Sequence, residues 1–207
     1  MSRSSAQLQT DRRTEILDAA KRCFARSGFH LASMQDICAE AGMSPGNLYR
    51  YFKSKEALIA GIAERDRAEV GQTFERVDAS ADFFAVLEGL ARHHFVERPQ
   101  EDVQVCTEIM TESRRNPDIA RIFQSFDADV KARLLTMLQQ AAERGDVDRD
   151  IDFESVVLML MVIADGVWWR RASDPSFDPE TMIPVLMDIT RYLLGRSAAR
   201  ANKGTSQ

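Results

Sequence analysis

The chain has 207 residues, of which 44% are hydrophobic and 29% are charged, and its formal net charge is −5. This composition is typical of a globular protein and excludes a wholly disordered or collagen-like chain. The longest uninterrupted apolar run lies between Val156 and Ala164, well short of the ~20 residues that a membrane-spanning helix needs. Because residues 1–5 lead into charged residues without an apolar stretch, we expect no secretory signal, no membrane partner and a cytoplasmic protein.

Charge is distributed unevenly along the chain. Residues 1–60 carry nine Lys and Arg against six Asp and Glu, and residues 61–207 carry 18 against 26. The first part therefore has a net charge of +3 and the rest a net charge of −8, which indicates that only the first part meets a polyanion. The cysteines Cys23, Cys38 and Cys106 form no CxxC pair, so we expect reduced thiols.

Every strong apolar pattern has a helical period, so the sequence predicts an all-α protein. A polar, disordered tail is expected over residues 1–9, followed by a first helix near residues 10–27 that ends at Gly28. Eight further helices are expected near residues 33–41, 45–52, 53–77, 81–97, 102–114, 118–144, 153–172 and 179–195. Prolines and glycines lie at or beside the breaks. Residues 196–207 are expected to form a polar tail.

Two of the short helices, separated by a turn at Gly42, have the layout of a helix-turn-helix. We expect Ser33 to cap the first of them, with Asp36 completing a capping-box pair. Ser44 is expected to cap the second, where Pro45 takes the first position and loses no hydrogen bond. The start of each helix is therefore defined by a residue suited to that position.

The second helix of this pair exposes residue types that suit the major groove of DNA. At 100° per residue, Leu48 and Phe52 fall together and dock the helix on the core. Arginine can bind guanine, asparagine can bind adenine or phosphate, and tyrosine hydroxyls can reach phosphates. The candidate contacts on or beside the outward face are Gly46, Asn47, Tyr49, Arg50 and Tyr51. Ser33, Lys55 and the free N–H groups at the start of this helix offer further contacts to phosphate.

The same surface also fits a helical protein-interaction adaptor that does not touch DNA, so two interpretations remain open at this point. An enzyme is not expected, because the chain contains no HExxH, GxSxG, GxGxxG or P-loop motif. No cofactor or metal is expected either. His93 and His94 are neighbours and point ~100° apart on a helix, which does not suit a shared metal, so we expect surface or core histidines.

Residues 11–60 closely resemble the DNA-binding head of TetR-family transcriptional regulators. The resemblance rests on the segments 16–20, 24–29 and 33–58. It implies a nine-helix, all-α architecture with a three-helix helix-turn-helix head over residues 10–60 and a ligand-binding and dimerisation body over residues 61–195. It also implies a homodimer, usually a repressor, that binds double-stranded operator DNA with an inverted repeat until a small-molecule effector binds the body.

The resemblance carries the head contacts over to eight positions, namely Ser33, Ser44, Pro45, Gly46, Asn47, Tyr49, Tyr51 and Lys55. Arg50 stands at a position that varies in the family, so its role rests on the helical wheel alone. The family often has Thr where Ser33 stands, and the hydroxyl group is retained. A second, shorter resemblance joins residues 165–172 and 177–178 to the body of BetI-type members, and we infer no ligand from it.

The helix expected over residues 153–172 is apolar at every angle, which indicates burial on more than one side. TetR-like proteins usually pair their last two helices in a four-helix dimer interface, and we expect that arrangement here. The expected interface residues are Val162, Gly166, Leu186, Ile189 and Leu193. The alternative is that both helices pack only within one subunit.

The effector pocket is expected in the body, where methionines can line an irregular space, although each candidate also fits an ordinary core position. The candidates are Phe84, Phe95, Cys106, Met110, Phe126, Met137, Met161, Asp165 and Trp168. Asp165 lies within an otherwise apolar helix, so we expect it to be buried and to need a partner. That partner is either Arg170 or Arg171, of the same or a second subunit, or a cationic ligand that also meets Trp168 or Trp169.

Overall fold

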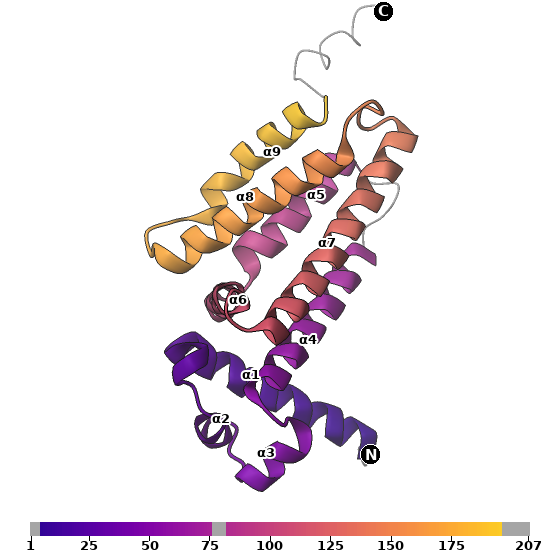
Figure 1. Ribbon diagram of the computed structural model, residues 1–207. Helices are drawn as coiled ribbons and strands as arrows, with labels where there is room; N and C mark the ends of the chain where they lie inside the picture. The colour runs from indigo at the N-terminus through magenta and orange to yellow at the C-terminus, as the bar shows by residue number, and fades with distance from the viewer. Residues whose placement is uncertain (1–4, 76–81, 196–207) are drawn as a thin grey trace, which may run out of the picture. The chain divides into compact units, whose positions relative to one another are not determined.

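A computed structural model describes residues 5–75 and 82–195, and within these ranges the protein consists of nine α-helices, one π-helical turn and one 3-10 turn. The elements are α1 (Ser5–Leu31), α2 (Met34–Glu40), α3 (Pro45–Tyr51), α4 (Lys55–Glu75), α5 (Phe83–Arg92), η1 (His93–Glu97), α6 (Gln100–Ser113), α7 (Pro117–Arg144), α8 (Phe153–Ser173), η2 (Pro179–Thr181) and α9 (Met182–Leu193). The all-α, nine-helix expectation is confirmed for this part of the chain (Figure 1). The predicted tail over residues 196–207 lies outside it. Within the same ranges, no helix is long and apolar enough to cross a membrane.

The helices pack into two compact units. One unit lies within Met1–Glu69 and Pro99–Phe126, and the other lies within Val70–Arg98 and Asp127–Gln207. This division crosses the boundary expected near residue 60, because α6 and the first part of α7 pack with α1 to α4.

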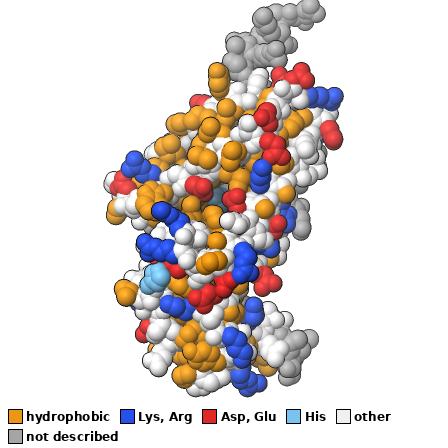
Figure 2. Space-filling view, in the orientation of Figure 1, with side chains coloured by type: hydrophobic (Ala, Val, Ile, Leu, Met, Phe, Trp, Pro, Cys, Tyr) orange, Lys and Arg blue, Asp and Glu red, His pale blue; other side chains and the backbone are white. Residues whose placement is uncertain are grey.

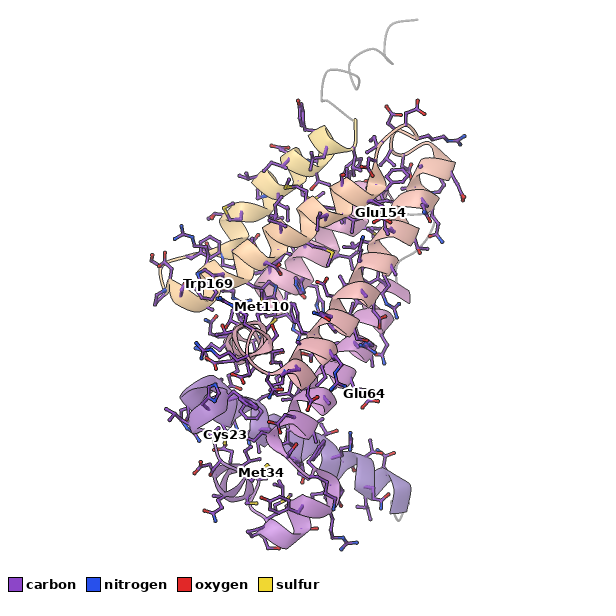
Figure 3. All side chains as sticks on the ribbon, viewed as in Figure 1. Cys23, Met34, Glu64, Met110, Glu154 and Trp169 are labelled. Carbon is purple, nitrogen blue, oxygen red and sulfur yellow. The ribbon has the colours of Figure 1, made fainter. Side chains whose placement is uncertain are left out.

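One hydrophobic core joins the elements of the first unit. Its buried members include Phe24 of α1, Ile37 of α2, Leu48 of α3, Leu58 of α4, Val105 and Ile109 of α6, and Ile119 of α7. Cys23 also belongs to this core, and Met34 of α2 packs against it (Figure 3). Burying a side chain of this size contributes about 1.5–3 kcal/mol. The helix-turn-helix segment therefore shares one continuous core with α1, α4, α6 and α7.

Helix α1 differs from the prediction at both ends. It begins at Ser5, so the expectation of a disordered tail over residues 1–9 is wrong from Ser5 onward. Gln7 donates a hydrogen bond to Asp11 one turn later, at 3.0 Å, and such pairs support a helix made of polar residues. Near the other end, Gly28 interrupts the helix with φ 73° and ψ 167°, a conformation that glycine alone adopts readily. Helical turns resume as far as Leu31.

In the second unit, α5 and α9 pack together through buried apolar side chains such as Phe83, Leu87, Ile183 and Met187. Helix α8 is buried along one side only. Val157 and Trp168 lie in the core, whereas Leu158 and Val162 are exposed. The apolar residues at every angle of α8 thus form one inner side and one outer side within a single chain.

Replacing Gly61 of α4 with alanine should destabilise the first unit. The new Cβ would lie 2.9 Å from Leu17 Cδ2 and 2.9 Å from Phe52 Cε1, and overpacking of this kind costs about 1–3 kcal/mol. Gly89→Ala in α5 is the control, because its Cβ would meet no atom within 4 Å and should raise stability by about 0.5–1 kcal/mol. Urea unfolding of both variants checks this, and equal stabilities for the two would contradict the packing described around Gly61.

Candidate nucleic-acid interface

Helix α2 begins with the capping box that the sequence predicts. The Ser33 hydroxyl donates to Asp36 Oδ2 at 2.6 Å and accepts from the Asp36 N–H at 3.1 Å. The Ser33 N–H also donates to Asp36 Oδ2, at 2.8 Å. The hydrogen bonds from Ser33 hold the pKa of Asp36 below its usual value. Because Asp36 takes both donors of Ser33, a phosphate that binds Ser33 must replace this carboxylate.

The turn between α2 and α3 places Ser44 at the start of α3. Gly42 has φ +62°, and the Met43 N–H donates to the Cys38 carbonyl at 3.0 Å. Ser44 occupies the N-cap position, but its side chain makes no capping hydrogen bond, so this part of the prediction is wrong. Pro45 at the first helical position removes one N–H that would otherwise need a partner. The exposed Ser44 hydroxyl therefore remains available to another group.

Helix α3 is oriented by its apolar side. Leu48 and Phe52 are buried in the core of the first unit, while Gly46, Tyr49 and Arg50 are exposed. Arg50 makes no ion pair with any residue in the described ranges. Tyr51 differs from the prediction, because its ring packs partly against the core and is only half-buried rather than fully outward. Asn47 is also half-exposed on the outer side.

Lys55 does more than offer a charge near the candidate interface. Its ammonium group donates to the carbonyl of Phe29 at 2.6 Å and to that of His30 at 3.3 Å. The same nitrogen lies 4.5 Å from the centroid of the Phe29 ring. Lys55 thus caps the carbonyl end of α1, a structural role that the sequence pattern does not reveal.

The predicted pocket residues fall in both units. Cys106, Met110 and Phe126 lie in the first unit, and Phe84, Phe95, Met137, Met161, Asp165 and Trp168 lie in the second. In the second unit, the ring of His94 contacts those of Phe95 and Trp168. Its centroid lies 5.0 Å from the centroid of the Phe95 ring and 4.8 Å from that of Trp168. Trp168 Nε1 donates to His94 Nε2 at 2.6 Å. Met137 and Met161 are half-buried, and Phe84 is a core residue.

His94 was not among the predicted pocket residues. It lies in the π-helical turn η1, and such turns often occur at functional sites. Burial lowers the pKa of His94 to about 3. The ring is therefore neutral at physiological pH, with Nε2 accepting from Trp168 and the proton on Nδ1.

The expectation that Asp165 is buried is wrong, because this side chain is exposed in the single chain. Neither Arg170 nor Arg171 pairs with it in the described residues. Arg171 instead donates to the carbonyls of Phe95 at 2.9 Å and Arg98 at 2.6 Å, and so caps the end of η1. Partial desolvation, together with the nearby negative charge of Asp127, raises the pKa of Asp165.

The outer side of α8 and α9 exposes large apolar side chains. Leu158 is 59% exposed and Trp169 58% exposed on α8, and Tyr192 is 79% exposed on α9 (Figure 3 labels Trp169). Figure 2 shows hydrophobic side chains gathered over these two helices. Of the five predicted interface residues, Val162, Gly166 and Ile189 are exposed, and Leu186 and Leu193 are half-buried. Contiguous apolar surface of this kind is typical of an interaction site.

Two family models match the chain. Residues 16–62 match the model of the bacterial regulatory proteins of the tetR family, and residues 85–195 match that of the C-terminal part of BetI-type transcriptional repressors. Both resemblances seen in the sequence are thereby confirmed.

Relatives cover most of the chain. It is 34% identical over 166 residues to the HTH-type transcriptional regulator UidR of Escherichia coli (strain K12), with 75% of this chain and 79% of UidR covered. It is 29% identical over 187 residues to the HTH-type transcriptional repressor Rv1474c of Mycobacterium tuberculosis, with 90% and 94% covered. Among solved structures, Salmonella enterica GusR matches with a TM-score of 0.78 and 29% identity, and the match covers 89% of this chain and 96% of GusR.

Because burial lowers the pKa of His94, the free energy of unfolding should decrease as the solution becomes more acidic. Between pH 6.5 and about pH 3, the unfolded chain binds a proton at His94 that the folded chain does not, so stability present above pH 6.5 is lost as the pH falls. In His94→Gln, whose amide oxygen can still accept from Trp168, the loss of unfolding free energy between pH 7 and pH 5 should be smaller by about 2 kcal/mol. Denaturant unfolding at both pH values measures it, with His93→Gln as the control. An identical loss in wild type and His94→Gln would refute the burial of this ring.

Proposed function

Because the chain belongs to the TetR family of bacterial regulatory proteins and is a helix-turn-helix transcriptional repressor, we propose that it binds a palindromic operator as a homodimer and is released by a small-molecule effector. The observation that carries the proposal is the outward face of α3, which Leu48 and Phe52 hold in place from the opposite side. The family consists of regulators and not of enzymes, which confirms that the chain is not an enzyme. Membership in this family of transcriptional regulators also removes the support for the alternative, a protein-interaction adaptor that does not bind DNA.

In the proposed complex, α3 lies in the major groove. Arg50 reads a base edge, Asn47 binds a base or a phosphate, and Gly46 lets the backbone approach the duplex. The remaining contacts go to the phosphates on either side of the groove. They come from the side chains of Ser33, Ser44, Tyr49, Tyr51 and Lys55. Pro45 contributes indirectly, because it forms the start of α3, where free N–H groups can bind a phosphate. Lys55 contributes chiefly by fixing the end of α1, since two of its three N–H groups are already used there.

The outer side of α8 and α9 is the proposed contact with a second copy of the chain. Its extent supports this assignment, because the exposed residues Leu158, Val162 and Trp169 recur every turn or two along α8. Asp165 lies on the same side of α8, between Val162 and Trp169. Dimerisation would therefore bury the carboxylate that a single chain leaves exposed.

The proposed effector site lies in the body, and the group formed by Phe95, His94 and Trp168 supports its place in the second unit. A neutral histidine beside two aromatic rings favours an effector with apolar or aromatic surface and at least one group that can accept from His94 Nδ1. The other predicted pocket residues stay predictions. We further propose that the protein acts in the cytoplasm, where its operator is.

DNA binding and the role of Arg50 can be tested together. Duplexes that the wild-type protein selects from a random library should be bound with an affinity that falls steeply with salt, by ~0.9 log unit per log salt for each phosphate neutralised. Arg50→Ala should lose about 1–3 kcal/mol on these duplexes and relax the selected sequence at one position in each half-site. Arg115→Ala removes the same charge from an exposed position between α6 and α7 and should leave the preference unchanged.

Fluorescence anisotropy titrations and a second round of selection with Arg50→Ala supply both readouts. Equal weakening on every sequence would assign Arg50 to a phosphate instead of a base. If the wild-type protein shows no salt-sensitive binding to any duplex, the proposed function fails.

Gly166→Leu should disrupt the dimer without disturbing the fold of the chain. Gly166 is exposed, and a Cβ there meets no atom within 4 Å in a single chain, so the added side chain starts in open space unless a second subunit covers this position. Gly89→Leu in α5 is the matched control, since its Cβ is equally unobstructed. Analytical ultracentrifugation should show a weakened dimer for the first variant alone. An unchanged dimer would place Gly166 outside the interface.

A further inference from the structure

Two carboxylates of α6 contact the end of α1, close to the point where the chain turns towards α2. Glu108 Oε2 accepts a hydrogen bond from the Phe29 N–H at 3.1 Å. The same oxygen lies 3.1 Å from the place that a Cβ at Gly28 would occupy. The carboxylate thus rests directly against the backbone at the break in α1, where a side chain larger than hydrogen would push it away.

Glu112, one turn further along α6, binds the next residue of the same segment. Its Oε2 lies 2.7 Å from His30 Nε2, and its side chain is only 7% exposed, against 64% for that of His30. A carboxylate removed from water is costly unless a donor faces it. Because Glu108 and Glu112 are four residues apart, both project from one face of α6 onto residues 28–30.

A third polar contact joins the same two helices. Lys21 of α1 and Asp102 of α6 form an ion pair in which both side chains are almost buried. Between these polar contacts, Val105 and Ile109 of α6 enter the hydrophobic core under α1. Helix α6, seen end-on in Figure 1, is therefore attached to α1 along most of its length.

Residues 28–30 determine where the DNA-binding surface begins. Lys55 of α4 binds the carbonyls of Phe29 and His30, so this short segment is held from two sides, by α4 through its carbonyls and by α6 through an N–H and an imidazole. Two residues later, Ala32 is buried and Ser33 starts the capping box of α2. A displacement of the segment would shift Ser33 and, through α2, the whole helix-turn-helix.

We propose that Glu108 and Glu112 are positioning residues for operator binding, which act by fixing residues 28–30 although they lie about 50 residues beyond the DNA-binding segment. The inference rests on the proposed function, since it assigns these carboxylates a part in the same DNA complex. A purely structural role for the two side chains would affect the stability of the fold without changing the discrimination between operator and unrelated DNA.

The first test compares Glu108→Ala with Glu108→Gln. The glutamine oxygen can still accept from the Phe29 N–H, whereas alanine leaves that N–H without its acceptor. Glu108→Ala should bind the selected duplex about tenfold more weakly, and Glu108→Gln should bind within about twofold of wild type. Binding to an unrelated duplex at low salt should stay unchanged in both variants. Anisotropy titrations well below the unfolding temperature of each variant give these values.

The second test avoids any change in the core. His30 is exposed, so His30→Ala should fold, but it removes the donor that faces Glu112. His30→Ala should lose operator affinity and keep unspecific affinity. His93→Ala is the matched control, because His93 makes a similar contact, 3.0 Å from Glu97, in the second unit, and it should lose neither.

The outcomes separate the two proposals. If wild type discriminates its selected duplex but Glu108→Ala and His30→Ala do so equally well, the positioning role is overturned and the proposed function stands. The positioning role is likewise overturned if both variants lose specific and unspecific binding in parallel. If wild type itself binds no DNA, the proposed function fails first.

Discussion

Burial of Leu48 and Phe52 is the constraint on which the DNA-binding surface depends. Leu48 lies within α3 and Phe52 follows its last residue directly, so burying both side chains in the core holds α3 at two points and fixes its orientation. Gly46 and Arg50 then point outward because no other direction remains for them. The recognition face is a consequence of apolar packing on the opposite side, and the polar residues need only be compatible with it.

The core that contains Leu48 and Phe52 extends beyond the helix-turn-helix segment. Val105, Ile109 and Ile119 complete the core from α6 and α7, although they follow α3 by more than 50 residues. The DNA-binding segment and its supporting helices consequently form one compact unit. This arrangement explains why polar contacts from α6 reach the end of α1.

Much of this unit could be predicted from local rules. Ser33 and Asp36 form the expected capping box, Gly42 turns the chain between the two short helices, and the helical wheel gives the buried side of α3 correctly. These features depend on neighbours within four residues, so the sequence pattern contains them. The helical start at Ser5 was missed because polar residues without an apolar stripe do not favour a helix by periodicity.

Features that depend on distant residues were not predictable. The position of Lys55 next to the Phe29 carbonyl requires α4 to fold back beside the end of α1, and the hydrogen bond from Trp168 to His94 joins residues 74 positions apart. Asp165 was expected to be buried because the residues around it are apolar, yet that apolar side of α8 is exposed in one chain. Local hydrophobicity signals burial without showing whether the same chain or another one provides it.

A methylation footprint on a selected duplex measures most directly whether α3 lies in the major groove. Dimethyl sulfate modifies guanine N7 in the major groove and adenine N3 in the minor groove, so it reports which groove the protein fills. Two copies of α3 in the major groove should protect guanines in two symmetric half-sites spaced by one or more helical turns of ~10 base pairs. Protection of adenine N3 alone, or of a single half-site, would contradict this prediction.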